Sequence, residues 1–304
     1  MNSHRDWTSA GFSLPPVAPV IGPFGLPGFL STLWENLASE EAELCIFESD
    51  DALAALTIGH GRLEFVGHRD LVDYRSPLGG GAADLFREVV DSVPPGTRIL
   101  FDSLPEEAVE PIGSGLGELG LDHVVTVHTT AAVLSLPDSF DDYLTSIGKK
   151  ERHELRRKRR RFEASGGSLD LQRATTDGEA FRRFVDLHRR SDGEKGSFMT
   201  DRMERFFAAL YALPGWEIDS LVTEAGEVTA AAFGYVDESG YYLYNSAFSP
   251  DLRHLSPGQV MLGALIERAI GERRRIFDFL KGEEPYKYRL GATERPLYEI
   301  LAVR

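Results

Sequence analysis

The stretch from Leu255 to Ala292 reads LSPGQVMLGALIERAIGERRRIFDFLKGEEPYKYRLGA, and the fold assignment rests on its pattern. Ser256 and Pro257 stand where a helix N-cap and a first helical residue are expected. Ile276–Leu280 is short and rich in β-branched and aromatic residues, which predicts a buried strand. Between them, apolar residues recur at helical spacing, at Val260, Leu262, Leu265, Ile266 and Ala269. The stretch therefore predicts a loop, a helix, a strand and a second polar loop.

The start of this predicted helix is suited to bind an anion. Gly258 adds no side-chain bulk, and the backbone N–H groups of Ser256, Gly258 and Gln259 could face a phosphate. The same residues also fit an ordinary capped helix that packs on a sheet. Both interpretations remain open from the loop alone.

Several motifs in this stretch resemble one known family. SPG before a helix, then a strand ending in DFLKG, then E-x-Y-K-x-x-x-G, is similar to Gcn5-related N-acetyltransferase (GNAT) members connected with cellulose biosynthesis, relatives of the Fem-type aminoacyltransferases. The matching residues are Leu255, Ser256, Pro257, Gly258, Asp278, Phe279, Lys281, Gly282, Glu283, Tyr286, Lys287 and Gly291. The basic segment KKERHELRRKRRRFEASGG resembles the one that precedes the family's acetyltransferase domain. The resemblance covers residues 140–292 well and the N-terminal half loosely.

The chain also contains an internal repeat. ELCIFESDDALAALTIGHGRLEFVG parallels DSLVTEAGEVTAAAFGYVDESGYYLYNSA, the loop at Ser76 parallels that at Ser256, and RILFDSL at Arg98 parallels RIFDFLKG at Arg275. An order of strands, loop, helix and strand that occurs twice indicates two copies of one α/β unit. With the resemblance, this predicts an α/β (α+β) chain of tandem GNAT-like (acyl-CoA N-acyltransferase) fold, with two mixed sheets flanked by helices.

The repeat suggests domain boundaries. We expect an N-terminal arm over residues 1–27, a degenerate GNAT-like half over 28–140, a basic linking helix over 141–167 and a C-terminal GNAT acetyltransferase domain over 168–304. The first copy has no counterpart of Tyr286 and Lys287, so the active centre is expected in the second copy.

Transfer of an acyl group to an amine needs a held donor, a polarised carbonyl and a route for the amine's proton. The resemblance implies acetyl-CoA as acyl donor, with its pyrophosphate at Ser256, Gly258 and Gln259. It also implies that the strand Gly240–Phe248, including Tyr244, lines the donor's arm.

Proton removal requires a carboxylate, a tyrosine or a water chain near the attacking nitrogen. The candidates are Asp278, Glu283 and Tyr286. Each also has a structural interpretation: Asp278 as a turn cap, Glu283 as a solvated loop charge and Tyr286 as a core residue.

Lys287 has two interpretations of equal weight. The resemblance places it on the lysine that Fem-type enzymes hold near the transferred acyl group, where an ammonium could stabilise an oxyanion. Alternatively, it forms a salt bridge with Glu283, Glu284 or Glu294. If the polar loop is extended, Tyr286 and Lys287 point to opposite faces.

Basic charge is concentrated between Lys149 and Arg161, where nine residues are lysine or arginine and only two are glutamate. A solvated helix, a phosphate site and a tRNA or membrane-surface patch remain open as interpretations of this segment.

His188 matches a leucine–histidine pair of the family's first helix, whereas Asp192 stands where many relatives carry tryptophan.

Composition limits the function classes. A net charge of −15 disfavours a general nucleic-acid binder. The single cysteine, Cys45, excludes a disulfide framework and a cysteine zinc site, and no metal is expected. No apolar run approaches a membrane span, so we expect a soluble cytoplasmic protein.

These features together favour an acyltransferase that moves an acyl group, most simply acetyl from acetyl-CoA, to an amine or hydroxyl of a small molecule or a polysaccharide or cell-envelope precursor. The alternatives are Fem-like transfer from aminoacyl-tRNA, and a degenerate acetyltransferase fold that binds a partner in polysaccharide biosynthesis.

Overall fold

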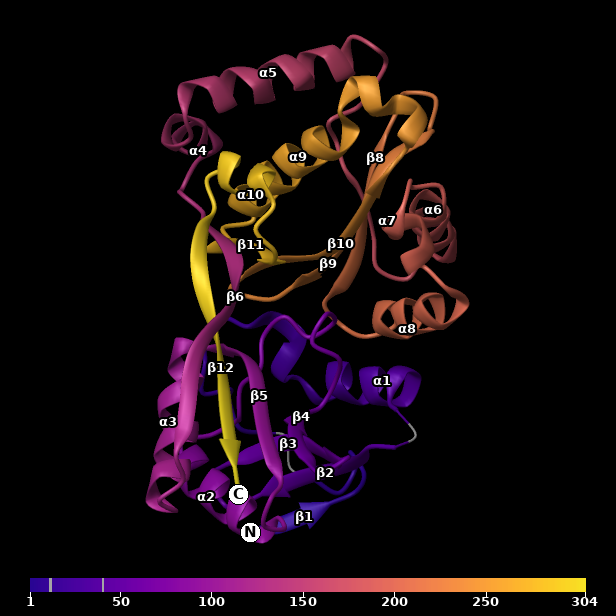
Figure 1. Ribbon diagram of the computed structural model, residues 1–304. Helices are drawn as coiled ribbons and strands as arrows, with labels where there is room; N and C mark the ends of the chain where they lie inside the picture. The colour runs from indigo at the N-terminus through magenta and orange to yellow at the C-terminus, as the bar shows by residue number, and fades with distance from the viewer. Residues whose placement is uncertain (11–12, 40) are drawn as a thin grey trace. The chain divides into compact units, whose positions relative to one another are not determined.

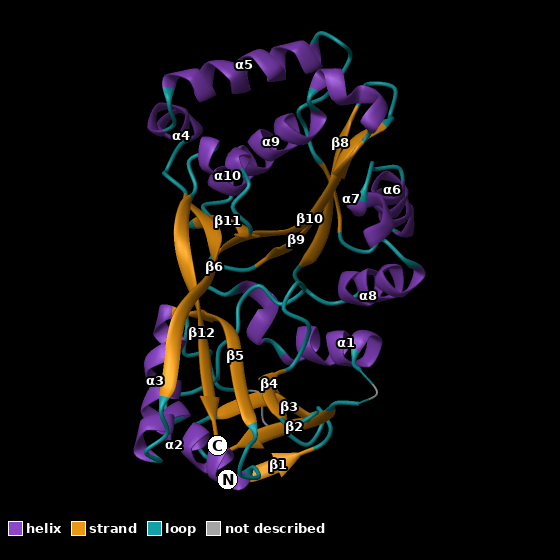
Figure 2. Cartoon of the chain, in the orientation of Figure 1, coloured by secondary structure: helices purple, strands orange, loops and turns teal. Residues whose placement is uncertain are grey.

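The computed structural model describes residues 1–10, 13–39 and 41–304 and shows a mixed α/β architecture (Figure 1, Figure 2). The chain divides into two compact units, one formed by residues 1–131 and 295–304 and the other by residues 132–294. The strands follow one hydrogen-bonded order, β1-β2-β3-β4-β5-β12-β6-β11-β10-β9-β8-β7. The sequence analysis expected two mixed sheets, whereas in the described residues these strands form one mixed 12-stranded sheet.

The first unit contains the N-terminal copy of the repeat. Its elements are β1 (Asn2–His4), η1 (Gly22–Gly25), α1 (Pro27–Leu37), β2 (Glu43–Glu48), β3 (Leu53–Gly59), β4 (Arg62–Phe65), α2 (Ala82–Ser92), β5 (Arg98–Pro105) and α3 (Glu106–Glu118). Two further strands, β6 (His123–Ser135) and β12 (Thr293–Val303), contribute residues to both units.

The second unit contains the C-terminal copy. Its elements are α4 (Phe140–Ser146), α5 (Lys149–Glu163), β7 (Gln172–Ala174), α6 (Gly178–Arg189), α7 (Glu194–Phe198), α8 (Asp201–Tyr211), β8 (Trp216–Val222), β9 (Val228–Val236), β10 (Gly240–Phe248), η2 (Pro250–Leu255), α9 (Pro257–Gly271), β11 (Ile276–Lys281) and α10 (Pro285–Arg289). The strand predicted over 240–248 has the predicted bounds, and the strand predicted over 276–280 extends by one residue.

The two copies share topology and register. In each, three antiparallel strands are followed by a helix and a strand that pairs in parallel with the third. Leu63 pairs with Ile99 in the first copy and Gly240 pairs with Ile276 in the second, so both members of the pair are offset by 177 positions (240 − 63 and 276 − 99). Ser103 and Leu280, also 177 apart (280 − 103), both have φ near +60°. The internal repeat inferred from the sequence is therefore a repeat in structure.

Helix α9 is the centre of the second unit's core. All five apolar positions predicted to line it, from Val260 to Ala269, are buried. Met261, Ala264 and Ile270 are buried as well, so the helix is covered on most of its circumference, as expected for an apolar helix between two layers. Leu155 and Phe162 of α5 belong to the same core cluster.

The observed units differ from the expected domain boundaries. The segment expected to be a surface arm contains β1, which pairs with β2, and Ala18, Ile21 and Phe24 are almost completely buried; residues 11 and 12 of that segment lie outside the described residues. The basic helix belongs to the second unit, because its apolar edge packs on α9. Residues 295–304 belong to the first unit, because Leu297–Val303 pairs with Arg98–Pro105.

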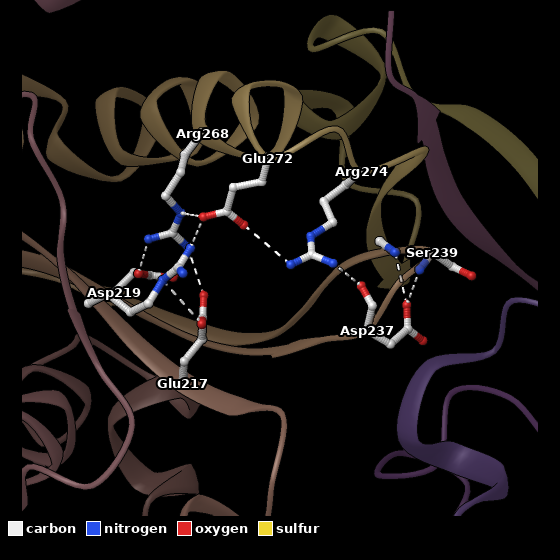
Figure 3. Close-up of polar contacts among 9 residues, drawn as sticks. Glu217, Asp219, Asp237, Ser239, Arg268, Glu272 and Arg274 are labelled. Atoms are coloured by element: carbon white, nitrogen blue, oxygen red, sulfur yellow. Dashed lines mark hydrogen bonds and ion pairs between the residues drawn. The ribbon is translucent and has the colours of Figure 1, made fainter. Parts of the chain in front are cut away.

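A network of charges joins the far end of α9 to the sheet (Figure 3). The Arg268 guanidinium of α9 lies 2.8 Å from Glu217 and 2.6 Å from Asp219, both on β8. The Tyr241 hydroxyl donates to Asp219 at 3.0 Å. Asp219 is completely buried, so its charge depends on these partners. The network therefore fixes how α9 lies on β8 and β10.

We expect Glu217 to make the stability of the protein depend on pH. Burial, together with the neighbouring charge of Asp219, raises the pKa of Glu217 from 4.5 to about 7. The folded protein then holds a proton that the unfolded chain releases. This contribution to the free energy of unfolding is complete below pH 4.5 and is lost as pH rises through about 7. Glu217→Gln should flatten the dependence of Tm on pH across this window.

Thermal unfolding of both proteins across that pH window checks this expectation, with the exposed Glu227→Gln as control. Parallel curves of Tm against pH for the Glu217 variant and the unmodified protein would show that the carboxyl titrates normally.

Candidate functional site

The candidate site begins where two parallel strands separate. β10 and β11 pair only over Gly240–Tyr242 and Ile276–Asp278, although β10 continues to Phe248 and β11 to Lys281. Beyond Tyr242, β10 continues to pair with β9 through a register shift between Leu243 and Asn245. Such a bulge re-aims side chains. The carboxyl halves of β10 and β11 therefore form a wedge in the second unit.

Tyr244, the expected donor-contacting residue, lies at this bulge. Its ring packs against Phe207, Trp216 and Phe233, with centroid distances between 5.3 and 6.5 Å. Phe207 belongs to α8, so the Tyr244 ring lies on the side of the sheet that carries α6 and α8. Tyr241 and Leu243 instead belong to the core cluster of α9.

The predicted phosphate loop lies at the start of α9. Ser256 has a left-handed backbone with φ 56°, and its N–H donates to the Arg253 carbonyl at 3.0 Å. The Gln259 N–H donates to the Ser256 carbonyl at 3.1 Å. Two of the three amides proposed to hold a pyrophosphate are therefore engaged within the backbone, which leaves Gly258 as the amide best placed to meet an anion.

Cationic side chains of α5 supplement this helix terminus. The Arg161 guanidinium donates to the Ser256 hydroxyl at 2.9 Å, and the Lys158 ammonium donates to the Gln259 side chain. Burial, with the charges of Arg157, Arg161 and Arg289 beside it, lowers the pKa of Lys158 against the opposing effect of Glu154. Burial is the main cause of this lowered pKa, and the three neighbouring positive charges add to it.

A cavity of about 310 Å³ lies between α5, the first turn of α9 and α10. Its lining is Lys150, Glu151, Glu154, Leu155, Lys158, Gln259, Tyr286, Arg289 and Leu290. Three cationic and two acidic residues face the same space, together with one tyrosine. The cavity can therefore bind an anion that also offers hydrogen-bonding groups.

Tyr286 and Lys287 belong to the short helix α10. The polar loop is not extended here, because Pro285 provides a fixed φ at the first helical position of α10. Tyr286 lines the cavity and lies 6.3 Å from the Phe279 ring. Burial, together with the charge of Glu284, raises the pKa of Tyr286 to about 12, so the hydroxyl remains protonated and is a donor at neutral pH.

Lys287 is buried, with 2% of its surface exposed. Its ammonium donates to three backbone carbonyls at the end of β11: Lys281 at 2.6 Å, Gly282 at 3.2 Å and Leu280 at 3.3 Å. Glu284 lies 3.0 Å from the same nitrogen. Four acceptors surround a group with three hydrogens, so in this geometry the ammonium organises the chain after β11.

The two carboxylate candidates have different surroundings. Asp278 is completely buried, and its side chain accepts from the Leu280 N–H at 2.7 Å. It therefore caps the turn in which Leu280 takes a φ of +60°. Glu283 is exposed beside this turn. Of the two, Glu283 is the carboxylate that solvent and a substrate can reach.

Comparison with known proteins identifies the second unit. Residues 149–288 match the family model described as "Acetyltransferase (GNAT) domain". This segment of the second unit is similar to a GNAT domain. A comparison with curated protein sequences gives no match.

Solved structures are similar along almost the whole chain. FemX has a TM-score of 0.63 at 14% identity, with 98% of this chain and 97% of that chain covered. L-PGS from Bacillus licheniformis has a TM-score of 0.57 at 14% identity, covering 96% and 93%. The C-terminal domain of a putative lysylphosphatidylglycerol synthetase from Agrobacterium fabrum has a TM-score of 0.59 at 12% identity, covering 90% and 91%. At these identities the similarity shows the fold alone, and the tandem GNAT-like fold is confirmed.

Residues 1–10, 13–39 and 41–304 contain no cluster of three or more His, Cys, Asp or Glu arranged to hold a metal ion. None of their helices combines the length and apolarity that a membrane crossing requires.

Sequence reasoning missed three residues that the structure brings to the site. Lys158 and Arg161 were visible only as members of a charged run, and Asn245 as an ordinary strand residue. A signal existed for Lys158, which lies three positions after the buried Leu155 and four before the buried Phe162, a spacing that places all three on the same side of the helix. The sequence gives no comparable signal for Asn245, because its contacts depend on the bulge.

We expect Lys287→Met to destabilise the protein. The methionine keeps most of the aliphatic stem but leaves the carbonyls of residues 280–282 without their donor. A buried polar group that loses its partner costs about 1–3 kcal/mol, so Tm should fall measurably. Denaturant unfolding of Lys287→Met, with the exposed Lys149→Met as control, measures this cost. A Lys287 variant of unchanged stability that has lost about 10²–10³ in turnover would instead support the oxyanion role.

Proposed function

We propose that the second unit transfers an acyl group from acyl-CoA, with acetyl-CoA as the simplest donor, to an amine or hydroxyl of a small molecule or of a polysaccharide or cell-envelope precursor. The cation-lined cavity between α5, α9 and α10 carries this proposal. It lies beside the start of α9 and contains polar groups from all three helices.

Charge complementarity supports a phosphate-bearing donor. Lys158 and Arg161 approach the first residues of α9 from α5, and the amino end of a helix adds its own partial positive charge. The chain as a whole carries a net charge of −15, so this positive site contrasts with its acidic surroundings. A bound phosphate would relieve the repulsion that contributes to the lowered pKa of Lys158. Donor binding would then also neutralise the positive charge around Lys158.

The roles of the remaining residues follow from their surroundings. Glu283 is exposed and can accept a proton from the attacking group. Tyr286, whose hydroxyl remains protonated, can donate a hydrogen bond to the donor or to the leaving group. Asp278 and Lys287 hold the turn after β11 and so position both. The Gly258 amide contacts the donor's phosphates, while Arg161 holds Ser256 and Lys158 holds the Gln259 side chain.

Aminoacyl transfer from tRNA is the second candidate, and the outer face of α5 favours it. Arg156, Arg157 and Arg160 are exposed there, as a phosphate backbone would require. FemX and the lysylphosphatidylglycerol synthetase domain have the same fold. Lys158 and Arg161, on the side of α5 that faces α9, would therefore bind acyl-CoA, whereas Arg156, Arg157 and Arg160, on the exposed side, would bind tRNA.

We expect Arg161→Gln to weaken acetyl-CoA binding by about tenfold or more, because a charge-assisted hydrogen bond contributes about 1.5–3 kcal/mol. Arg160→Gln is the matched control: it removes the same charge from the same helix, but on the exposed face. Calorimetric titration with acetyl-CoA measures both variants. Equal affinities for the two variants would remove Arg161 and the start of α9 from the donor site.

The same pair of variants tests the tRNA alternative. Binding of tRNA that falls steeply with salt, is weakened by Arg160→Gln and is accompanied by no acetyl-CoA binding would replace the CoA donor with an aminoacyl-tRNA.

A further inference from the structure

Asn245 is held in an unusual way at the bulge of β10. Its side-chain oxygen accepts a hydrogen bond from the backbone N–H of Ser246 at 2.7 Å. The same oxygen lies 2.6 Å from Nε2 of His188. His188 belongs to α6 and has 1% of its surface exposed. Two separate elements therefore fix the orientation of this one amide.

These contacts assign the atoms of both side chains. A backbone N–H can only donate, so the Asn245 atom that meets Ser246 is the oxygen, not the nitrogen. Since that oxygen only accepts, Nε2 of His188 carries the proton. Both contacts use Oδ1, so the Nδ2 group of Asn245 is available to donate to another acceptor.

The position of Asn245 places this donor beside the wedge between β10 and β11. Pairing between β10 and β11 ends at Tyr242 and Asp278, so Asn245 lies on the part of β10 that borders the wedge. It still pairs with Phe233 of β9, which keeps its backbone in the sheet. A rigid side-chain donor at the edge of a gap between two strands is suited to bind a developing negative charge.

We propose that Asn245 is a catalytic residue whose Nδ2 donates to the carbonyl oxygen of the acyl group during transfer. This inference rests on the proposed function. The acceptor's nitrogen or oxygen lone pair forms a bond to the acyl carbon, and the carbonyl π electrons move to the oxygen, which Asn245 stabilises. When these electrons return, the carbon–sulfur bond breaks and the pair leaves on sulfur. The acceptor's proton passes through a base such as Glu283 to the leaving thiolate.

His188 is a positioning residue in this arrangement. It acts through Asn245, because its Nε2–H fixes the amide and thereby the direction in which Nδ2 points. The aromatic rings of Phe184 and Phe198 lie 5.1 and 6.1 Å from the imidazole and hold it in place. His188→Phe should therefore lower kcat while leaving the KM for the donor nearly unchanged. His188→Gln, which restores an N–H donor, should recover part of the loss.

The decisive variant is Asn245→Asp, which retains an oxygen for Ser246 and His188 but replaces the donor with an acceptor. [1-¹³C]acetyl-CoA reports the contact directly, because a hydrogen bond to the thioester carbonyl moves its carbon resonance downfield. We expect this shift in the unmodified protein and its loss in Asn245→Asp and Asn245→Leu. With an amine acceptor, kcat should fall by about 10²–10³. Near-UV circular dichroism and Tm confirm that each variant is folded.

The outcomes separate the two hypotheses. If acetyl-CoA binds and the carbonyl resonance is the same in the unmodified protein and in Asn245→Asp, Asn245 has no contact with the acyl group, while the proposed function stands. If calorimetry detects no binding of acetyl-CoA to the unmodified protein, both the proposed donor and this role are wrong. Retention of over about half of the unmodified kcat by Asn245→Asp would also overturn the inference.

Discussion

Three backbone carbonyls at the carboxyl end of β11 converge on the ammonium group of Lys287, and the candidate site depends on this contact. Buried carbonyls need donors, and here one side chain supplies them for residues 280–282. Asp278 caps the same turn through the Leu280 N–H. Together they direct the chain into α10, which brings Tyr286 to the cavity. Lys287 and Asp278 stabilise this end of β11 in place of pairing with β10, and this allows the two strands to separate into the wedge.

The first copy meets the same constraint differently. At the end of β5 the Asp102 carboxylate pairs with the buried Arg75 guanidinium at 3.1 Å, and the Arg75 N–H donates to the Ser103 carbonyl at 2.9 Å. Arg75 directly precedes Ser76, in the loop that corresponds to the SPG loop at Ser256, so this loop is held against β5 by one of its own side chains. β5 then enters α3 directly. The two copies therefore share the backbone conformation at the end of the strand but differ in the side chain that stabilises it.

Helix α5 shows how one charged segment can serve two purposes. Leu155 and Phe162 bury one edge against α9, and this packing directs Lys158 and Arg161 toward the start of α9. Arg156, Arg157 and Arg160 remain in solvent. The Arg268 network at the opposite end of α9 fixes the helix on β8. Since both ends of α9 are held, its amino terminus lies beside the cavity in a defined position, with Gln259 in the cavity lining.

The sequence by itself determined the secondary-structure elements and the repeat. Helical and strand periodicity are patterns among neighbouring residues, and the 177-residue offset follows from comparing the chain with itself, so neither requires tertiary information. It located β10 and β11 to within a residue and the start of α9 at Pro257, and it selected Tyr286 and Lys287 as candidate site residues. Tertiary structure decided what these side chains do. Whether Lys287 meets an oxyanion or three carbonyls depends on how the chain turns after Leu280, and whether Asn245 presents its nitrogen depends on a bulge and on a histidine 57 residues away. Such contacts join residues far apart in sequence, so no periodicity encodes them.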